Sequence, residues 1–259
     1  MAVPEGLHVV EHHAARAGVP EVVLVHGSLD GAASFGRVVR RLQDLRVVTY
    51  DRRGYRGSRR VRPLGVLEDH VNDLVELVGR GPAVVIGHSY GGDVAIGAAL
   101  AAPGAVVGLG AWEPPPSWLE WWPRRARQPG DEDPALFAEH FFRRMVGDGA
   151  WERAGLRVRQ RVEADGPALM AELMALRSSG APFDISALSV PAVFGRGGDS
   201  RPHHRRAVAE LVGMVPGSAL FEVPDAAHGV HLTHPAAFAS FVCAVLEAAG
   251  SAEEREQRA

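Results

Sequence analysis

The sequence predicts an α/β fold in which a mostly parallel central sheet is flanked by helices and carries a helical insertion. Short runs rich in Val and Ile alternate along the chain with longer segments of helical periodicity, separated by Gly, Pro and Asp. The runs are continuously apolar, as expected of strands that are buried on both faces of a parallel sheet. The length of 259 residues, of which 46% are hydrophobic and 23% charged, fits an ordinary globular domain.

Strands are expected at seven places, the first of them an antiparallel edge strand. They are Leu7–Glu11, Glu21–Val25, Arg46–Tyr50, Ala83–Ile86, Ala105–Ala111, Val190–Phe194 and Ala219–Val223. Helices are expected between them. The segment Tyr90–Ala102 is apolar nearly all round, as a buried helix is. The other expected helices are Ala32–Leu42, Leu67–Val78, Ala207–Met214 and Pro235–Ala248.

The alternation is interrupted between Glu113 and about Leu188, where no strand is predicted. Three helical patterns lie there, at Pro134–Val146, Ala150–Val162 and Pro167–Arg177. We therefore expect a core made of residues 1–112 and 189–250 and a helical insertion of residues 113–188. The charged tail, residues 251–259, is expected to be flexible.

The basic residues and the single cysteine exclude several kinds of chemistry. All 28 basic residues are Arg, so the chain has no lysine for a Schiff base, for pyridoxal phosphate or for a P-loop. Cys243 allows no internal disulfide and no zinc site with two or four cysteines, and we expect it in the core. His228, His231 and His234 are spaced by three, but no carboxylate pattern accompanies them. We expect no cofactor and no metal.

Charge, hydropathy and the lone cysteine favour a cytoplasmic protein without a nucleic-acid or membrane partner. The net charge of −3 gives no support for a nucleic-acid partner. The first ten residues lack the features of a signal peptide. No stretch approaches the roughly 20 apolar residues that cross a bilayer, so we expect no membrane association. A lone cysteine fits a reducing compartment.

The strongest chemical signal is Gly-His-Ser-Tyr-Gly at residues 87–91, which matches the pattern G-x-S-x-G between a predicted strand and a predicted helix. A serine on such a sharp turn exposes its hydroxyl above the sheet, in a strained backbone conformation. Glycines flank it because the strand and helix come too close for side chains. The helix N-terminus behind it favours developing negative charge. Ser89 is therefore the predicted nucleophile.

Together with three further motifs, this arrangement resembles the α/β-hydrolase superfamily over nearly the whole chain. Val25–Ser28 is similar to the family's His-Gly motif at a strand end, and Asp51–Ser58 resembles its D-x-R-G-x-G-x-S loop, with Arg56 where Gly is usual. His228 follows the last strand, at the family's catalytic-histidine position. The resemblance implies a triad in the order serine, acid, histidine and an insertion that forms a cap over the nucleophile.

Two residues compete to be the acid of this triad. Glu113 follows a strand 24 residues after Ser89, where some members of the superfamily place their acid. Asp199 follows the next strand, one residue earlier than the usual Gly-x-x-Asp pattern. A buried carboxylate at the end of an apolar strand needs a partner such as His228, which favours Glu113. Glu113 could instead pair with an arginine, and Asp199 could simply form a turn.

The resemblance also implies an oxyanion hole formed by the N–H groups of Ser28 and Tyr90. The insertion holds four of the five tryptophans, and we expect most of its aromatic residues to build its own core. The arginines between positions 52 and 62 are expected to form a solvated loop rather than a site for an anionic substrate. Candidate liners of an apolar substrate pocket are His26, Trp112, Trp118 and Trp121.

The predicted function is that of a serine hydrolase acting through an acyl-enzyme. Its substrate is expected to be a small or medium ester, lactone or thioester with an apolar acyl or alcohol part. The same triad could serve acyl transfer, C–C bond hydrolysis, perhydrolysis or a cyclisation in secondary metabolism, and the same fold could serve a non-catalytic ligand receptor. Epoxide hydrolysis and dehalogenation are disfavoured, because those families use an aspartate where this chain has Ser89.

Overall fold

The strands of the sheet follow the apolar runs of the sequence. The computed structural model describes residues 4–13, 18–79, 81–123, 132–178 and 180–256. Seven strands form one sheet in the order β1-β3-β2-β4-β5-β6-β7, with β1 antiparallel to β3 and the other pairs parallel. Their bounds are β1 Val9–His12, β2 Glu21–Val25, β3 Val47–Tyr50, β4 Ala83–His88, β5 Val106–Trp112, β6 Ala192–Gly197 and β7 Ala219–Val223. The predicted fold class is confirmed.

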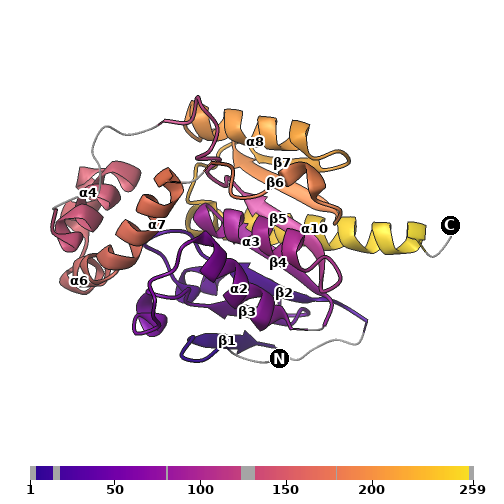
Figure 1. Cartoon of the computed structure of the whole chain (residues 1–259), viewed down its shortest axis with the longest axis horizontal. Helices are drawn as coiled ribbons and strands as arrows, with labels where there is room; N and C mark the ends of the chain where they lie inside the picture. The colour runs from indigo at the N-terminus through magenta and orange to yellow at the C-terminus, as the bar shows by residue number, and fades with distance from the viewer. Residues whose placement is uncertain (1–3, 14–17, 80, 124–131, 179, 257–259) are drawn as a thin grey trace.

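Helices cover both faces of this sheet (Figure 1). One face carries α2 (Leu67–Val78), α3 (Tyr90–Ala101) and α8 (Pro202–Met214), whose apolar side chains share a core with the strands. The other face carries α1 (Gly36–Val39) and α10 (Pro235–Glu256), with the single turn α9 (Val230–Thr233) beside them. The inner parallel strands β2 to β6 are thus buried on both sides, which explains their continuous apolar runs, whereas the edge strand β7 is largely exposed.

Four helices form a separate layer beyond the carboxyl ends of the strands, at the left of Figure 1. These are α4 (Pro134–Val146), α5 (Asp148–Arg153), α6 (Leu156–Ala164) and α7 (Gly166–Ser178), which all belong to the helical insertion, residues 113–188. The insertion has its own small core, formed by Phe137, Ala138, Trp151, Val162 and Leu169. Phe141 and Phe142 pack against this core, whereas Trp118 packs against the main core and Trp121 and Trp122 contact α8. About half of the insertion's aromatic residues therefore build its interior, fewer than expected from the sequence.

Several boundaries differ from the predictions. The helix expected over Ala150–Val162 is two helices, because Ala154 and Gly155 take extended backbone angles. The helix expected over Ala32–Leu42 is a 3₁₀ turn followed by the short α1. Helix α8 begins five residues before the expected position, with Pro202 in its first turn. Helix α10 continues to Glu256, so the expected flexible tail is helical there, and residues 257–259 lie outside the described residues.

Helix α10 also corrects two expectations. Its segment Pro235–Glu253 is long and apolar enough to cross a membrane by length and composition, although no such stretch was expected. In the fold it is a core helix, since Phe238, Phe241 and Val245 are fully buried against the sheet. Length and apolar composition alone are therefore weak evidence for a membrane span. Cys243, expected in the core, lies on the outer side of the helix and is exposed.

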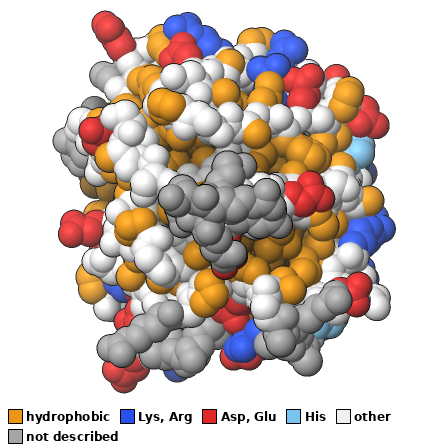
Figure 2. Space-filling model, turned by 90° about the vertical axis from the view of Figure 1, so that its right-hand side faces the viewer, with side chains coloured by type: hydrophobic (Ala, Val, Ile, Leu, Met, Phe, Trp, Pro, Cys, Tyr) orange, Lys and Arg blue, Asp and Glu red, His pale blue; other side chains and the backbone are white. Residues whose placement is uncertain are grey.

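The surface at the end of the molecule toward which α10 points carries both hydrophobic and charged side chains. Figure 2 shows hydrophobic side chains there interspersed with acidic and basic ones. The carboxyl ends of the strands and the helical insertion lie at the opposite end of the molecule (Figure 1). That opposite end is where parallel sheets of this kind place their functional loops.

Candidate active site

Ser89 lies on the tight turn between β4 and α3. Its backbone angles, φ 54° and ψ −129°, fall in the left-handed region that L-residues rarely adopt. Its N–H donates to the carbonyl of Trp112 at 2.8 Å, which ties the turn to the neighbouring strand. The side chain is only partly buried. The predicted strand-to-helix context of this serine is therefore present.

Two glycines make this turn possible. A Cβ at Gly87 would lie 2.0 Å from the carbonyl oxygen of Gly91, and a Cβ at Gly91 would lie 2.3 Å from the carbonyl oxygen of Val25. Real side chains do not approach backbone atoms so closely. The glycines on both sides of Ser89 therefore follow from the close packing of α3 on β4 and β2.

The sheet register places Ser89 and Glu113 at the same edge. In the β4–β5 pairing His88 lies opposite Trp112, so the next residue of each strand emerges side by side. Glu113 is fully buried, and its Oε2 accepts a hydrogen bond from Nδ1 of His228 at 2.8 Å. Its Oε1 accepts from the Gly197 N–H at 2.8 Å. The structure thus brings one of the two candidate acids into contact with the candidate base.

The other candidate acid lies apart from His228. The side chain of Asp199 is exposed, and within the described part of the chain it forms no hydrogen bond or ion pair. Its N–H donates to the carbonyl of Ala226 at 3.0 Å, so the residue forms part of a loop contact. A Cβ at Gly197 would lie 2.1 Å from that same carbonyl oxygen. Glycine there lets the loop before His228 pass close over β6 and reach the end of β5.

Two more histidines surround His228. His88 donates from Nε2 to the backbone carbonyl of His228 at 2.7 Å, which holds the histidine loop beside the nucleophile turn. His204 stacks on the His228 ring, with centroids 4.5 Å apart. Burial, with His228 as a further cause, lowers the pKa of His204 to about 2, so it stacks as a neutral ring.

Both expected oxyanion donors lie around this turn. Tyr90 is the first residue of α3, and the first N–H groups of a helix have no acceptor within it. The Ser28 N–H follows β2, and among the described residues it has no acceptor. A Cβ at the preceding Gly27 would lie 3.0 Å from Cβ of Ser89, which shows how closely this segment passes the nucleophile.

The sequence profile of a family described as the alpha/beta hydrolase family matches residues 22–241. The chain belongs to this family. It is therefore a hydrolase, and the resemblance drawn from its motifs is confirmed. A search of curated proteins finds no match.

Solved structures with the same fold include three hydrolases. An esterase from Thermogutta terrifontis shares 21% identity and a TM-score of 0.68, with 94% of this chain and 93% of that chain covered. The enol-lactonase from Burkholderia xenovorans LB400 shares 18% identity and a TM-score of 0.72, with 93% and 96% covered. A structure from work on carboxylesterases of Nitrososphaera gargenis shares 17% identity and a TM-score of 0.71, with 97% and 98% covered. At these identities the likeness shows the fold.

Two of the expected pocket residues of this hydrolase are buried in the core instead. Trp112 is fully buried on the face covered by α10, where it packs against Phe241 at 5.6 Å. His26 is also fully buried, and both of its ring nitrogens are within hydrogen-bond distance of backbone atoms. The expectation that they line a pocket was wrong, because neither has surface left to offer a substrate.

The two candidate tryptophans between β5 and α4 lie apart from the triad. Trp118 lines a hollow of about 480 Å³ with Phe183 and Ile185, to which no triad candidate contributes. Trp121 donates from Nε1 to Glu210 at 2.7 Å and lies under the Arg206 guanidinium. Both are partly exposed. Their contacts are with the loop before β6 and with α8, and a pocket role for them stays a prediction.

The arginine loop of the hydrolase is not simply solvated. Arg56 and Arg59 pair with Asp165 of the insertion, each at 2.8 Å, and this carboxylate is fully buried. Arg52 pairs with Glu172, also of the insertion and also fully buried. The arginines thus dock the insertion onto the core, a role that the sequence analysis missed. The sequence does not show which residues the arginines pair with, because the partners lie more than 100 residues away.

Two clusters near the nucleophile contain the residue types that bind metals, with their nearest candidate atoms within 4.8 Å of one another. In each cluster a carboxylate oxygen already lies within hydrogen-bond distance of a histidine ring, at 2.8 and 3.0 Å. Hydrogen bonding therefore accounts for both arrangements, and the absence of a metal stays a prediction. The clusters are Glu113, His204, His228 and Asp30, His88, His231.

Proposed function

We propose that this hydrolase cleaves a small or medium ester, lactone or thioester with an apolar part, through an acyl-enzyme on Ser89. The observation that carries the proposal is the hydrogen bond between Glu113 and Nδ1 of His228 at the sheet edge where Ser89 lies. A buried carboxylate on one ring nitrogen fixes the tautomer whose other nitrogen, Nε2, is free to accept a proton.

The chemistry then proceeds in two halves. Nε2 of His228 takes the hydroxyl proton as Oγ of Ser89 attacks the carbonyl carbon, and Glu113 stabilises the imidazolium. The N–H groups of Ser28 and Tyr90 stabilise the oxyanion. His228 returns the proton to the leaving group, and the acyl-enzyme forms. Water, deprotonated by His228, attacks this ester, and the acid product leaves as Ser89 regains its proton.

The helical insertion supports this proposal by its position. It docks on loops that follow β2 and β3, at the edge of the sheet that carries the candidate triad. We propose that it acts as the cap that covers the bound substrate. The esterase and enol-lactonase structures of the same fold support an acyl substrate. A cytoplasmic location belongs to the same proposal, and fractionation of cells that produce the protein tests it.

The test is a panel of p-nitrophenyl esters, lactones and acyl thioesters of graded chain length. We expect hydrolysis that Ser89→Ala abolishes, and labelling of the wild type by a fluorophosphonate that the same variant loses. A folded wild-type protein that neither labels nor cleaves any of them would refute the proposal. It would favour a cyclisation or a receptor on this fold instead.

Matched substitutions of the two acids test the triad. Glu113→Gln should lower kcat by about 10³- to 10⁴-fold, because His228 loses the charged partner that holds its tautomer. Asp199→Asn serves as the control, and it should leave kcat within about twofold, since the exposed side chain touches no described residue of the site. A larger loss in Asp199→Asn than in Glu113→Gln would reverse the assignment.

A further inference from the structure

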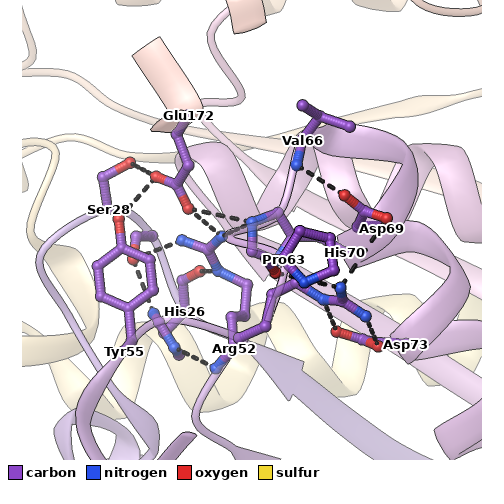
Figure 3. Close-up of polar contacts among 12 residues, drawn as sticks. His26, Ser28, Arg52, Tyr55, Pro63, Val66, Asp69, His70, Asp73 and Glu172 are labelled. Carbon is purple, nitrogen blue, oxygen red and sulfur yellow. Dashed lines mark hydrogen bonds and ion pairs between the residues drawn. The ribbon is translucent and has the colours of Figure 1, made fainter. Parts of the chain in front are cut away.

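A buried ion pair joins the helical insertion to the loop after β3. Arg52 and Glu172 have no exposed surface, and Glu172 comes from α7 (Figure 3). Taking two charges out of water is costly unless the remaining hydrogen-bonding positions are also satisfied. The two side chains are therefore expected to make further hydrogen bonds besides their ion pair.

Arg52 holds the backbone of the segment that leads to the expected oxyanion donor. Its Nε donates to the carbonyl of His26 at 2.8 Å, and its second terminal nitrogen donates to the carbonyl of Gly27 at 3.1 Å. His26 accepts the Arg52 N–H on Nε2 at 2.8 Å and donates from Nδ1 to the Gly27 carbonyl at 2.7 Å. Burial, with Arg52 as the next cause, lowers the pKa of His26 to about 3, which agrees with this neutral tautomer.

The Gly27 carbonyl and the Ser28 N–H belong to one peptide group. A peptide is planar and trans, so its C=O and its N–H point in opposite directions. Two donors that fix the Gly27 oxygen therefore also fix the direction of the Ser28 N–H. The hydrogen bonds further polarise this peptide, which strengthens its N–H as a donor.

Glu172 holds the same segment from the side of the insertion. Its Oε2 accepts from the Ser28 hydroxyl at 2.7 Å and from the Tyr55 hydroxyl at 2.7 Å, and its Oε1 accepts from Arg52 (Figure 3). His70 lies 3.4 Å from Oε1. One carboxylate of α7 thus contacts both Ser28 itself and the arginine that orients its backbone.

We propose that Arg52 and Glu172 are positioning residues that orient the Ser28 N–H toward the oxyanion formed at Ser89. It follows that the oxyanion hole is complete when α7 is docked on the core. This inference rests on the proposed function, because it assigns a task to a donor of the acyl-transfer site.

The chain contains a matched control for this pair. Arg53, the next residue, forms a two-pronged ion pair with Asp73 at 2.6 and 2.7 Å, and the Asp73 carboxylate is nearly buried. This pair makes no contact with residues 26–28 among its hydrogen bonds. If Arg52 and Glu172 only stabilised the fold, then Glu172→Gln and Asp73→Asn should affect the enzyme in the same way.

The experiment compares Glu172→Gln and Arg52→Lys with Asp73→Asn on the most reactive ester of the panel. We expect the first two to lower kcat by about 10- to 100-fold, less than outright loss of an oxyanion donor costs, with KM within about threefold. The inhibition constant of a trifluoromethyl ketone, whose adduct with Ser89 carries the same oxyanion, should rise by the factor by which kcat/KM falls. Asp73→Asn should keep kcat within about twofold.

Thermal unfolding followed by circular dichroism shows that each variant is folded at the assay temperature. If Glu172→Gln does not fold, Tyr55→Phe replaces it, since it removes one donor from Glu172 and should lower kcat by about two- to tenfold. A folded Glu172→Gln with wild-type kcat would overturn the inference, as would an equal loss in Asp73→Asn. A wild type that cleaves no ester and binds no ketone would instead refute the proposed function.

Discussion

Asp93 allows a test of how much a single buried carboxyl lowers the free energy of unfolding. It lies in the first turn of α3, four residues after Ser89, and is fully buried. Neither of its oxygens has a hydrogen-bond partner among the described residues. Burial raises the pKa of this carboxyl well above its usual value, against the opposing charge of Arg52. Asparagine has nearly the same shape and does not ionise.

The raised pKa gives the effect a definite sign. The folded state binds the Asp93 proton more tightly than the unfolded chain, in which an aspartate has a pKa near 3.9. The contribution of Asp93 to the free energy of unfolding is therefore fully present below about pH 4. Above pH 4 it falls by about 1.4 kcal/mol per pH unit, until the pH passes the pKa of Asp93 in the folded state. Asp93→Asn does not suffer this loss. Its stability relative to the wild type should therefore rise as the pH rises above about 4, by at most about 1.4 kcal/mol per pH unit.

Urea unfolding of both proteins at pH 5, 5.5 and 6, followed by tryptophan fluorescence, measures this difference. All other titrating groups are shared, so the difference isolates Asp93. The exposed Asp44 supplies a control, and Asp44→Asn should change stability by less than about 0.5 kcal/mol at each pH. A gap between Asp93→Asn and the wild type that stays constant or shrinks as the pH rises would refute the reasoning.

Two further substitutions test the packing around the site. Gly91→Ala should destabilise the fold by more than about 3 kcal/mol, because the new Cβ would lie 2.3 Å from the Val25 carbonyl oxygen; a near-normal melting temperature would contradict this. Asp165→Asn should cost about 3 kcal/mol, because it leaves Arg56 and Arg59 without the buried carboxylate that they share. Urea unfolding checks the second value, and an unchanged midpoint would show that water replaces the carboxylate.

The parts of the fold that could be predicted are those with a local signal. A strand buried on both faces needs a continuous apolar run, so β2 was predicted to the residue. The edge strand β7 was also predicted to the residue, although most of its side chains are exposed. The amphipathic helix Leu67–Val78 was predicted equally well. Helix α8 was predicted five residues too short, because its first turn is polar and lies outside the apolar pattern.

The residues of the candidate site also differ in whether a local sequence signal predicts them. Ser89 was found from neighbouring glycines, since the clash that excludes side chains there is local. The contact of Glu113 with His228 could only be favoured, because it depends on how far the loop after β7 reaches across the sheet. Trp112 precedes Glu113, but the strand turns its side chain toward α10, and neither composition nor spacing shows which face a single residue takes.

The contacts of Glu172 could not be predicted at all. Its partners Ser28, Arg52 and Tyr55 lie 117 to 144 positions earlier in the chain. A trace of the signal was present, since Glu172 stands in a helical pattern between apolar residues, where a charge is costly. Such a carboxylate predicts a buried partner but does not identify it.

The outward position of Cys243 gives the molecule an unusual surface chemistry. Its exposed thiol is the sole cysteine of a chain that has no lysine. Partial burial, with Glu247 as a further cause, raises the pKa of this thiol, so it should react slowly at neutral pH and faster in mild alkali. A maleimide dye or a solid support can therefore be attached at a single defined point of α10, a helix that contributes none of the candidate triad residues.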